Sequence, residues 1–211
     1  MKLVFVRHGE STANRLREFS NSGFKHPLTE EGVGQAIKLA VNLSGLHVAQ
    51  IYTSPVLRAV QTAQVLADQW IAPLRITEAL REWDVGIYEG STGPSGWELH
   101  RKVQQDWFEK GQLDSCMPGG ESYKDIQARF VPFIEEILRT QNNPDLDMIL
   151  VSHGGLYIAM LPEILKNIDH AYARGHAVPY TGCVVAEPGS DGLVCLSWDG
   201  VPLLDQSKEV Q

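Results

Sequence analysis

The sequence is poor in the features that mark secreted, membrane-spanning and metal-binding proteins. Its 211 residues contain only three cysteines, Cys116, Cys183 and Cys195, which are far apart and form no Cys-x-x-Cys pair. An odd and dispersed set favours reduced thiols over a disulfide framework. The N-terminal apolar run, Leu3 to Val6, is far too short for a signal-peptide core or a membrane span. We therefore expect a soluble, cytoplasmic protein that does not bind a membrane.

Basic residues are also scarce, and no cluster of them stands out. The 18 lysines and arginines against 26 acidic residues give a formal net charge of -8. This balance argues against a nucleic-acid-binding or anionic membrane-binding surface, so any anion-binding site must be local. No internal repeat, low-complexity tract or long linker interrupts the chain, and 43% of its residues are hydrophobic. We expect one domain that spans residues 1–211.

What the sequence does contain is an alternation of strand and helix patterns. Apolar runs predict strands at residues 2–7, 48–54, 74–80 and 148–152. Helical spacing of apolar residues predicts the helices between them, at residues 30–43, 55–67, 97–110, 123–137 and 154–167. The C-terminal runs 182–186 and 193–198 flank a turn-rich connector and predict a hairpin. The expected fold class is α/β, a three-layer sandwich with a mostly parallel sheet.

Two helix starts carry clear signals, whereas the polar stretch from Asn14 to Asn21 predicts a loop. Thr29 is placed as an N-cap, and the expected buried face of its helix consists of Val33, Ala36, Ile37, Ala40, Val41 and Leu43. Ser54-Pro55 predicts a cap and first helical residue, which puts Arg58 in the first turn. A cation at that position opposes the helix dipole, so Arg58 either faces an anionic ligand or is an ordinary solvated residue.

Polar and cationic residues follow the expected strands at their carboxyl ends. Arg7-His8-Gly9 ends the first strand, and His153-Gly154-Gly155 repeats the arrangement after the fourth. Ligands bind outside the carboxyl ends of strands in parallel sheets, so His8, Arg58 and His153 should meet at one rim. An imidazole beside guanidinium groups is suited to holding and attacking a phosphoryl group. The sequence therefore predicts a phosphoryl-binding site.

Blocks of sequence in a fixed order carry a family resemblance. They are Arg7 to Ser11 with Asn14, Thr53 to Ala63, Leu80 to Glu82 with Gly86 and Glu89-Gly90, Pro118 to Ser122, and Val151 to Gly155. Together they resemble the histidine phosphatase superfamily, also called phosphoglycerate mutase-like, and the match runs almost end to end. The resemblance implies the phosphoglycerate mutase-like fold and an enzyme without a metal or cofactor.

The resemblance also implies roles at the rim. His8 would be the nucleophile that forms a phosphohistidine, with its other ring nitrogen donating to a backbone carbonyl. Arg7, Arg58 and His153 would bind the phosphoryl oxygens. Asn14 and the backbone of Gly154 would add neutral hydrogen bonds, and Ser20 would line the substrate pocket.

Glu82 would be the general acid and base of such a reaction, with Asp84 as its competitor. Its pKa should be raised, either by burial against Trp83 or by an acidic neighbour such as Glu10. Tyr88 and Trp97 are expected either to cover the substrate or to pack in the core. The assignment of Glu82 rests on the acid block, the shortest of the matching motifs.

Within the family, the sequence favours a phosphatase that acts on a small phosphorylated metabolite. Only residues 90–117 separate the acid block from the Pro-Gly-Gly-Glu-Ser block, and this stretch lacks the long insertion and paired arginines of phosphoglycerate mutases of this type. Mutase-type phosphoryl transfer is the alternative, and a non-catalytic binding protein of the same fold is a further one. The substrate itself and a homo-oligomeric state are left open.

Overall fold

The central element is a seven-stranded sheet with the order β3-β2-β4-β1-β5-β6-β7. The computed structural model describes residues 1–141 and 143–203, so residues 204–211 of the expected domain lie outside the described residues. The strands are β1 (Leu3–Arg7), β2 (Val48–Thr53), β3 (Leu74–Ile76), β4 (Asp147–Ser152), β5 (Cys183–Gly189), β6 (Gly192–Trp198) and β7 (Val201–Pro202). The first four are parallel, and the last three extend the sheet in antiparallel pairing. The mostly parallel α/β sheet with a C-terminal hairpin is confirmed.

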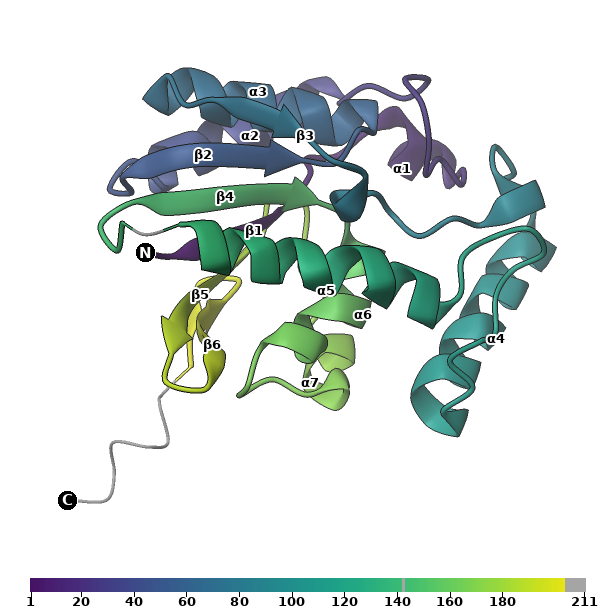
Figure 1. The fold of residues 1–211 in the computed structure, drawn as a ribbon. Coiled ribbons are helices and arrows are strands. Elements are labelled where there is room, and N and C mark those ends of the chain that lie inside the picture. Colours follow the sequence, from purple (N-terminus) through teal and green to yellow (C-terminus); the bar gives the residue numbers. More distant parts are fainter. Residues whose placement is uncertain (142, 204–211) are drawn as a thin grey trace.

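Helices cover both faces of this sheet (Figure 1). They are α1 (Thr12–Leu16), α2 (Glu30–Asn42), α3 (Leu57–Trp70), α4 (Pro94–Lys110), α5 (Tyr123–Thr140), α6 (Gly154–Ile164) and α7 (His170–Gly175), with short 3-10 helices η1 (Glu78–Leu80) and η2 (Gly86–Tyr88). In Figure 1, α2 and α3 lie on one face and α5, α6 and α7 on the other, while α4 lies beyond the N-terminal end of α5. The expected three-layer sandwich is confirmed.

Strand β1 shows why the sheet needs both helical layers. Its residues Leu3 and Phe5 belong to the hydrophobic core that α5 and α6 complete. Val4 and Val6 belong to the second core, which α2 and α3 complete. All four side chains are fully buried, as the continuous apolar run predicts for a strand covered on both faces.

Three local expectations are corrected by the structure. The stretch after Ser11 begins with the short helix α1, because Ser11 and Asn14 form a reciprocal capping box. Helix α3 starts at Leu57 and not at Pro55, since Val56 is its N-cap and the Ser54 side chain accepts from the backbone of Val56 at 3.3 Å. Strand β3 stops at Ile76, because the Thr77 side chain caps η1. Arg58 still lies in the first turn of α3.

The buried face of α2 differs from the expected one. Thr29 caps the helix as predicted, by accepting from the backbone of Gly32. Ala36 and Ala40 are buried, but Val33, Ile37 and Val41 are 39%, 53% and 62% exposed. The reason is the approach of α2 to the loop after β1: a Cβ on Gly32 would lie 2.0 Å from the carbonyl oxygen of Glu10. This contact turns Ala36, Leu39 and Ala40 inward and leaves Val33, Ile37 and Val41 outside.

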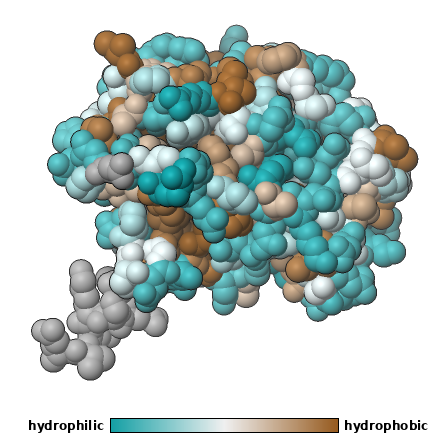
Figure 2. All heavy atoms as spheres, in the orientation of Figure 1, coloured by the Kyte–Doolittle hydropathy of each residue, from teal (hydrophilic) through white to brown (hydrophobic). Residues whose placement is uncertain are grey.

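Hydrophilic residues cover most of the face drawn in Figure 2, and the hydrophobic ones form separate groups. Large exposed hydrophobic side chains occur on several elements, such as Ile71 after α3 and Ile87 in η2. In the described parts of the chain, no helix is both long and apolar enough to cross a membrane.

The contact between α2 and the loop after β1 predicts opposite effects for two glycines of one helix. Gly32→Ala should lower the free energy of unfolding by about 1–3 kcal/mol, because the new methyl group overpacks the contact. Gly34 is exposed and a Cβ there would meet nothing within 4 Å. Gly34→Ala should therefore stabilise the helix by about 0.5–1 kcal/mol. Urea unfolding of both variants checks this, and equal effects would contradict it.

Candidate active site

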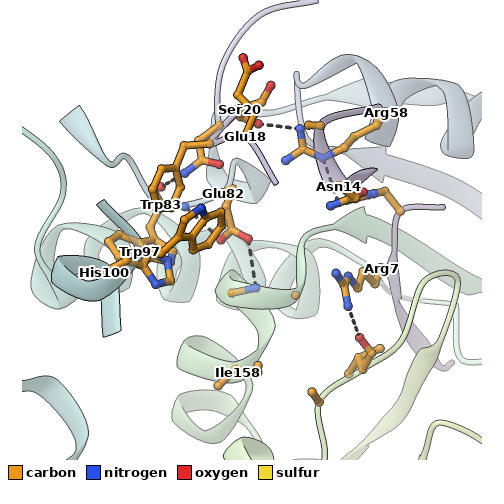
Figure 3. A pocket seen from close by; sticks show the side chains of 18 residues that line it. Arg7, Asn14, Glu18, Ser20, Arg58, Glu82, Trp83, Trp97, His100 and Ile158 are labelled. Atoms are coloured by element: carbon orange, nitrogen blue, oxygen red, sulfur yellow. Dashed lines mark hydrogen bonds between the residues drawn. The ribbon is translucent and has the colours of Figure 1, made fainter. Parts of the chain in front are cut away.

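A cavity of about 250 Å³ lies at the carboxyl ends of the parallel strands (Figure 3). It is lined by Arg7, His8, Ala13, Asn14, Glu18, Phe19, Ser20, Asn21, Arg58, Glu82, Trp83, Trp97, His100, Gly154, Gly155, Ile158, Ala177 and Val178. The lining includes every site residue expected from the sequence except His153. Parallel topology thus brings together side chains from both halves of the chain.

His8 is held as a neutral imidazole with one defined tautomer. Its Nδ1 lies 2.7 Å from the carbonyl oxygen of Gly9, which can only accept, so Nδ1 carries the proton. Its Nε2 accepts from Nε of Arg58 at 2.9 Å. Burial lowers the pKa of His8 well below its ordinary value, and the charges of Arg58 and Arg7 lower it further. The expected donation to a backbone carbonyl is confirmed, and Nε2 is the unprotonated nitrogen.

Arg58 is a buried cation whose three hydrogen-bond acceptors are neutral. Besides His8, it donates from Nη1 to the backbone oxygen of Ser20 at 2.6 Å and from Nη2 to Nδ1 of His153 at 3.0 Å. Its pKa is lowered to about 10, chiefly by burial, so the guanidinium remains charged at neutral pH. A charged donor with neutral acceptors at a cavity wall is well placed to accept an anion.

His153 lies behind Arg58 and does not line the cavity. Its side chain is fully buried, and its ring centroid is 5.1 Å from that of His8. Because Nδ1 accepts from Arg58, the neutral ring carries its proton on Nε2, which donates to Oγ of Ser54 at 2.7 Å. Burial, followed by the charge of Arg58, lowers its pKa well below the ordinary value. His153 therefore contacts the arginine and not the cavity.

Arg7 reaches the cavity from the end of β1. Its Nη1 donates to the backbone oxygen of Val178 at 2.8 Å, and its guanidinium carbon lies 4.3 Å from the ring centroid of Tyr180. In the part of the chain that the structure describes, its buried Nε has no hydrogen-bond partner. A Cβ on Gly154 would lie 3.1 Å from this nitrogen, so the glycine leaves room for the guanidinium.

Asn14 and Ser20 contribute polar groups from the segment after β1. Oδ1 of Asn14 accepts from the backbone and hydroxyl of Ser11, at 3.0 and 2.8 Å. This fixes the amide so that its NH2 group stays available toward the cavity, where Figure 3 shows Asn14 beside Arg58. Ser20 lines the cavity and holds Arg58 through its carbonyl oxygen.

Glu82 faces the cavity with a carboxylate held by backbone donors. Its Oε1 accepts from the backbone of Trp83 at 3.1 Å, and its Oε2 accepts from that of Gly155 at 3.0 Å. Burial raises the pKa of Glu82 and outweighs these hydrogen bonds, which lower it. The expected direction is confirmed with burial as its cause. The suggestion of Glu10 is wrong, because the Glu10 carboxylate pairs with Arg15 and accepts from Thr29 instead.

Asp84 is occupied elsewhere. Its Oδ1 accepts from the backbone of Gly86 at 2.7 Å, its Oδ2 lies 3.6 Å from Nη1 of Arg81, and it does not line the cavity. Gly155 favours Glu82 in a second way, since a Cβ there would lie 2.9 Å from both carboxylate oxygens. Between the two acids, only Glu82 is placed to reach a ligand.

Sequence reasoning missed much of the cavity wall away from the arginines. Trp97 lines the cavity, as the substrate-covering alternative predicts, but Tyr88 does not. Phe19, Trp83 and His100 join Trp97 in a cluster of stacked rings, which we call the aromatic wall. Its members come from separate segments, so no local spacing signals it. The segment after α7 adds Ala177 and Val178 to the lining.

Comparisons with known proteins match the chain along most of its length. The family model described as histidine phosphatase superfamily (branch 1) matches residues 3–200. A glucosyl-3-phosphoglycerate phosphatase of Mycobacterium tuberculosis is 29% identical over 178 residues, which cover 78% of this chain and 75% of that protein. A 2,3-bisphosphoglycerate-dependent phosphoglycerate mutase of Rhizobium etli is 30% identical over 161 residues, covering 72% and 74%.

Solved structures show the same fold. The mycobacterial glucosyl-3-phosphoglycerate phosphatase in complex with VO3 matches with a TM-score of 0.75 and 25% identity, over 94% of this chain and 98% of that one. The α-ribazole phosphatase of Shigella flexneri matches with a TM-score of 0.79 over 97% of this chain and 100% of that one, at 20% identity.

The hydrogen bonds of His8 predict its protonation directly. In nitrogen-15 spectra of protein without added anion, Nδ1 should be protonated and Nε2 unprotonated at about pH 6, below the ordinary histidine pKa. Unfolding in urea should restore ordinary titration, because it removes burial and the two guanidinium groups. A doubly protonated His8 ring at that pH in the folded protein would contradict the prediction.

Proposed function

The chain belongs to the histidine phosphatase superfamily, and we propose that it hydrolyses a small phosphomonoester through a phosphohistidine on His8, with Glu82 as the proton donor. The observation that carries this proposal is the unprotonated Nε2 of His8, which contacts Arg58 in a cavity shared with Arg7 and Glu82. Nucleophile, cations and a carboxyl group of raised pKa are the groups that phosphoryl transfer through histidine requires.

In the first step, the lone pair of His8 Nε2 attacks phosphorus and the ester P–O bond breaks. The hydrogen bond from Arg58 to Nε2 must give way first, which turns the guanidinium toward the arriving phosphoryl oxygens. Protonated Glu82 donates its proton to the departing alkoxide, so the leaving group departs as an alcohol. The Nδ1 proton stays on the hydrogen bond to Gly9 throughout.

In the second step, the carboxylate of Glu82 takes a proton from water, and the water oxygen attacks phosphorus. The N–P bond breaks, inorganic phosphate forms, and Nε2 of His8 recovers its lone pair. Glu82 ends the cycle protonated, as it began. Its raised pKa suits both roles, because the acid and base forms are then closer in free energy at working pH.

The surrounding groups stabilise the charge that develops on the phosphoryl oxygens. Among the described residues, Nε of Arg7 has no hydrogen-bond partner and Arg58 has neutral acceptors, so both can bind the phosphoryl group without breaking an ion pair. The amide of Asn14 and the backbone of Gly154 add neutral donors. We assign His153 a positioning role, because it holds Arg58 and orients it from behind.

The proposal extends to the setting of the enzyme: one domain of residues 1–211 that acts in the cytoplasm without a metal or cofactor. The dispersed thiols support a reducing compartment, and His8 with Glu82 supplies the nucleophile and the proton.

Trapping the intermediate tests the reaction. Protein mixed with an alkyl phosphate labelled in its phosphoryl group and quenched in alkaline detergent should carry acid-labile label on His8, located by mass spectrometry. His8→Ala should lose both the label and phosphate release, whereas the exposed-histidine control His47→Gln should keep both. Release of phosphate without label on His8 would refute the mechanism. Label passed to an added alcohol in preference to water would indicate mutase-type transfer, and no turnover at all would indicate a binding protein.

The role of Glu82 predicts a dependence on the leaving group. Glu82→Gln should slow phosphorylation of His8 by alkyl phosphates about a hundredfold to ten-thousandfold, the range that general acid catalysis supplies. The loss should be much smaller with nitrophenyl phosphate, whose leaving group needs little protonation. The rate of the pre-steady-state burst and the steady-state rate, measured together, separate this step from dephosphorylation. Asp84→Asn is the matched control and should change neither rate; a larger loss in that variant would transfer the role to Asp84.

A further inference from the structure

The two ends of the cavity differ in chemistry. Figure 3 shows Arg7 and Arg58 on one side and Trp83, Trp97 and His100 grouped on the other. The first side receives the phosphoryl group under the proposed function. The second side must therefore receive the alcohol that leaves.

Among the described residues, no lysine or arginine lines the leaving-group side of the cavity. Within residues 1–141 and 143–203, Arg7 and Arg58 are the only lysines or arginines that line the cavity, and both belong to the phosphoryl side. His100 is neutral at pH 7, because burial, followed by the nearby charge of Arg101, lowers its pKa to about 4. Arg101 itself does not line the cavity. A second phosphate or a carboxylate on the substrate would lose its hydration there without gaining an ion pair.

The carboxylate of Glu18 offers a hydrogen-bond acceptor and no cation. It lines the cavity, and its hydrogen bonds with Lys25 and His26 lower its pKa, so it is ionised at neutral pH. Lys25 balances its charge in an ion pair, so Glu18 leaves no net positive charge for a second anionic group, whereas a hydroxyl or ring nitrogen bearing hydrogen could donate to it.

The aromatic wall gives this side a flat shape. The rings of Phe19 and Trp97 stack at a centroid distance of 3.9 Å with 25° between their planes, and those of Trp83 and His100 stack at 4.4 Å and 27°. Nε1 of Trp97 donates to the backbone oxygen of Arg17 at 3.0 Å, which fixes the outer ring. Because the rings are already packed, binding a flat group against them costs little side-chain entropy.

Much of the remaining lining is apolar, and the cavity has room for a ring. Ile158, Ala177 and Val178 supply further apolar lining. The cavity measures about 250 Å³. A buried cavity of roughly 150 Å³ is enough to hold a benzene ring, so phosphoryl group and one ring together fit here.

We propose that the substrate is the monophosphate of an alcohol that carries a flat, uncharged ring within a few bonds of the ester oxygen and has no second phosphate or carboxylate. This inference rests on the proposed function and assigns its substrate class. The arginines bind the phosphoryl group, the ring packs on Trp97 and His100, and Glu82 protonates the ester oxygen between them.

Two matched pairs of primary alkyl phosphates test the class in the wild-type protein. Replacing the methyl end of propyl phosphate by a ring gives 2-phenylethyl phosphate, whose kcat/KM should be at least about tenfold higher through a lower KM. Replacing the free CH2OH of glycerol 3-phosphate by a carboxylate gives 3-phosphoglycerate, whose kcat/KM should be about tenfold lower. All four leaving groups are alkoxides, so intrinsic reactivity does not account for the differences.

Variants assign the two preferences to the residues. Trp97→Leu should lower the ratio of 2-phenylethyl to propyl phosphate about tenfold, because a branched side chain replaces the flat one. Ile158→Arg should raise the ratio of 3-phosphoglycerate to glycerol 3-phosphate by introducing a cation on the leaving-group side. Lys102→Ala is the control and should change neither ratio, because Lys102 is an exposed residue of α4, the helix that carries Trp97.

The outcomes separate the two proposals. If 2-phenylethyl phosphate is no better than propyl phosphate, or 3-phosphoglycerate is as good as glycerol 3-phosphate, the substrate class is overturned while phosphohistidine on His8 still supports the reaction. If no substrate gives phosphate or labelled His8, the proposed function fails with it. Thermal unfolding shows whether Trp97→Leu folds, and the wild-type ratios decide the question where it does not.

Discussion

The active site depends on one constraint, the burial of the Arg58 guanidinium. It is only 5% exposed, and a cation removed from water is costly unless its N–H groups are satisfied. His8, His153 and the carbonyl of Ser20 each accept one hydrogen bond from a different nitrogen of the guanidinium, without adding charge. For this both imidazoles must be neutral and turn a lone pair to the arginine, which places the proton of His8 on Nδ1 and that of His153 on Nε2. One cation therefore sets the protonation of two histidines, and an arriving anion would replace part of their contribution.

Close backbone approaches hold this arrangement together. The backbone of His8 donates to the carbonyl oxygen of Ser152 at 2.9 Å, which joins the ends of β1 and β4. Where β4 passes into α6, Gly154 leaves space for Arg7 and Gly155 presents its N–H to Glu82. The same junction thus positions Arg7, the proposed phosphoryl-binding cation, and Glu82, the proposed acid. Side chains at these two glycines would displace both, so the chemistry requires the bare backbone.

The sequence predicts the rim well and the wall poorly, for physical reasons. His8 and Arg58 could be placed because a strand pattern and a helix start are local signals, and parallel topology does the rest. The burial of His153 behind Arg58 could not be predicted, because side-chain packing decides whether a residue at the rim enters the cavity. The exposed face of α2 was misjudged because Ala36 and Ala40 fit two overlapping helical stripes, and the Gly32 contact selects one. The aromatic wall joins distant segments, so it exists only in the folded chain.

The position of β1 in the sheet affects when the enzyme can fold during its synthesis. Strand β1 precedes both of its neighbours in the chain: it pairs with β4, where Leu3 lies opposite Met148, and with β5, where Val6 lies opposite Cys183. At translation rates of roughly 5–20 residues per second, a nascent β1 waits on the order of ten seconds or more for these neighbours. During that time its apolar run cannot be buried natively, and such non-local pairing makes folding slow. His8, the proposed nucleophile, therefore reaches its final surroundings only after β4 and β5 have been synthesised, which makes activity a late event in folding.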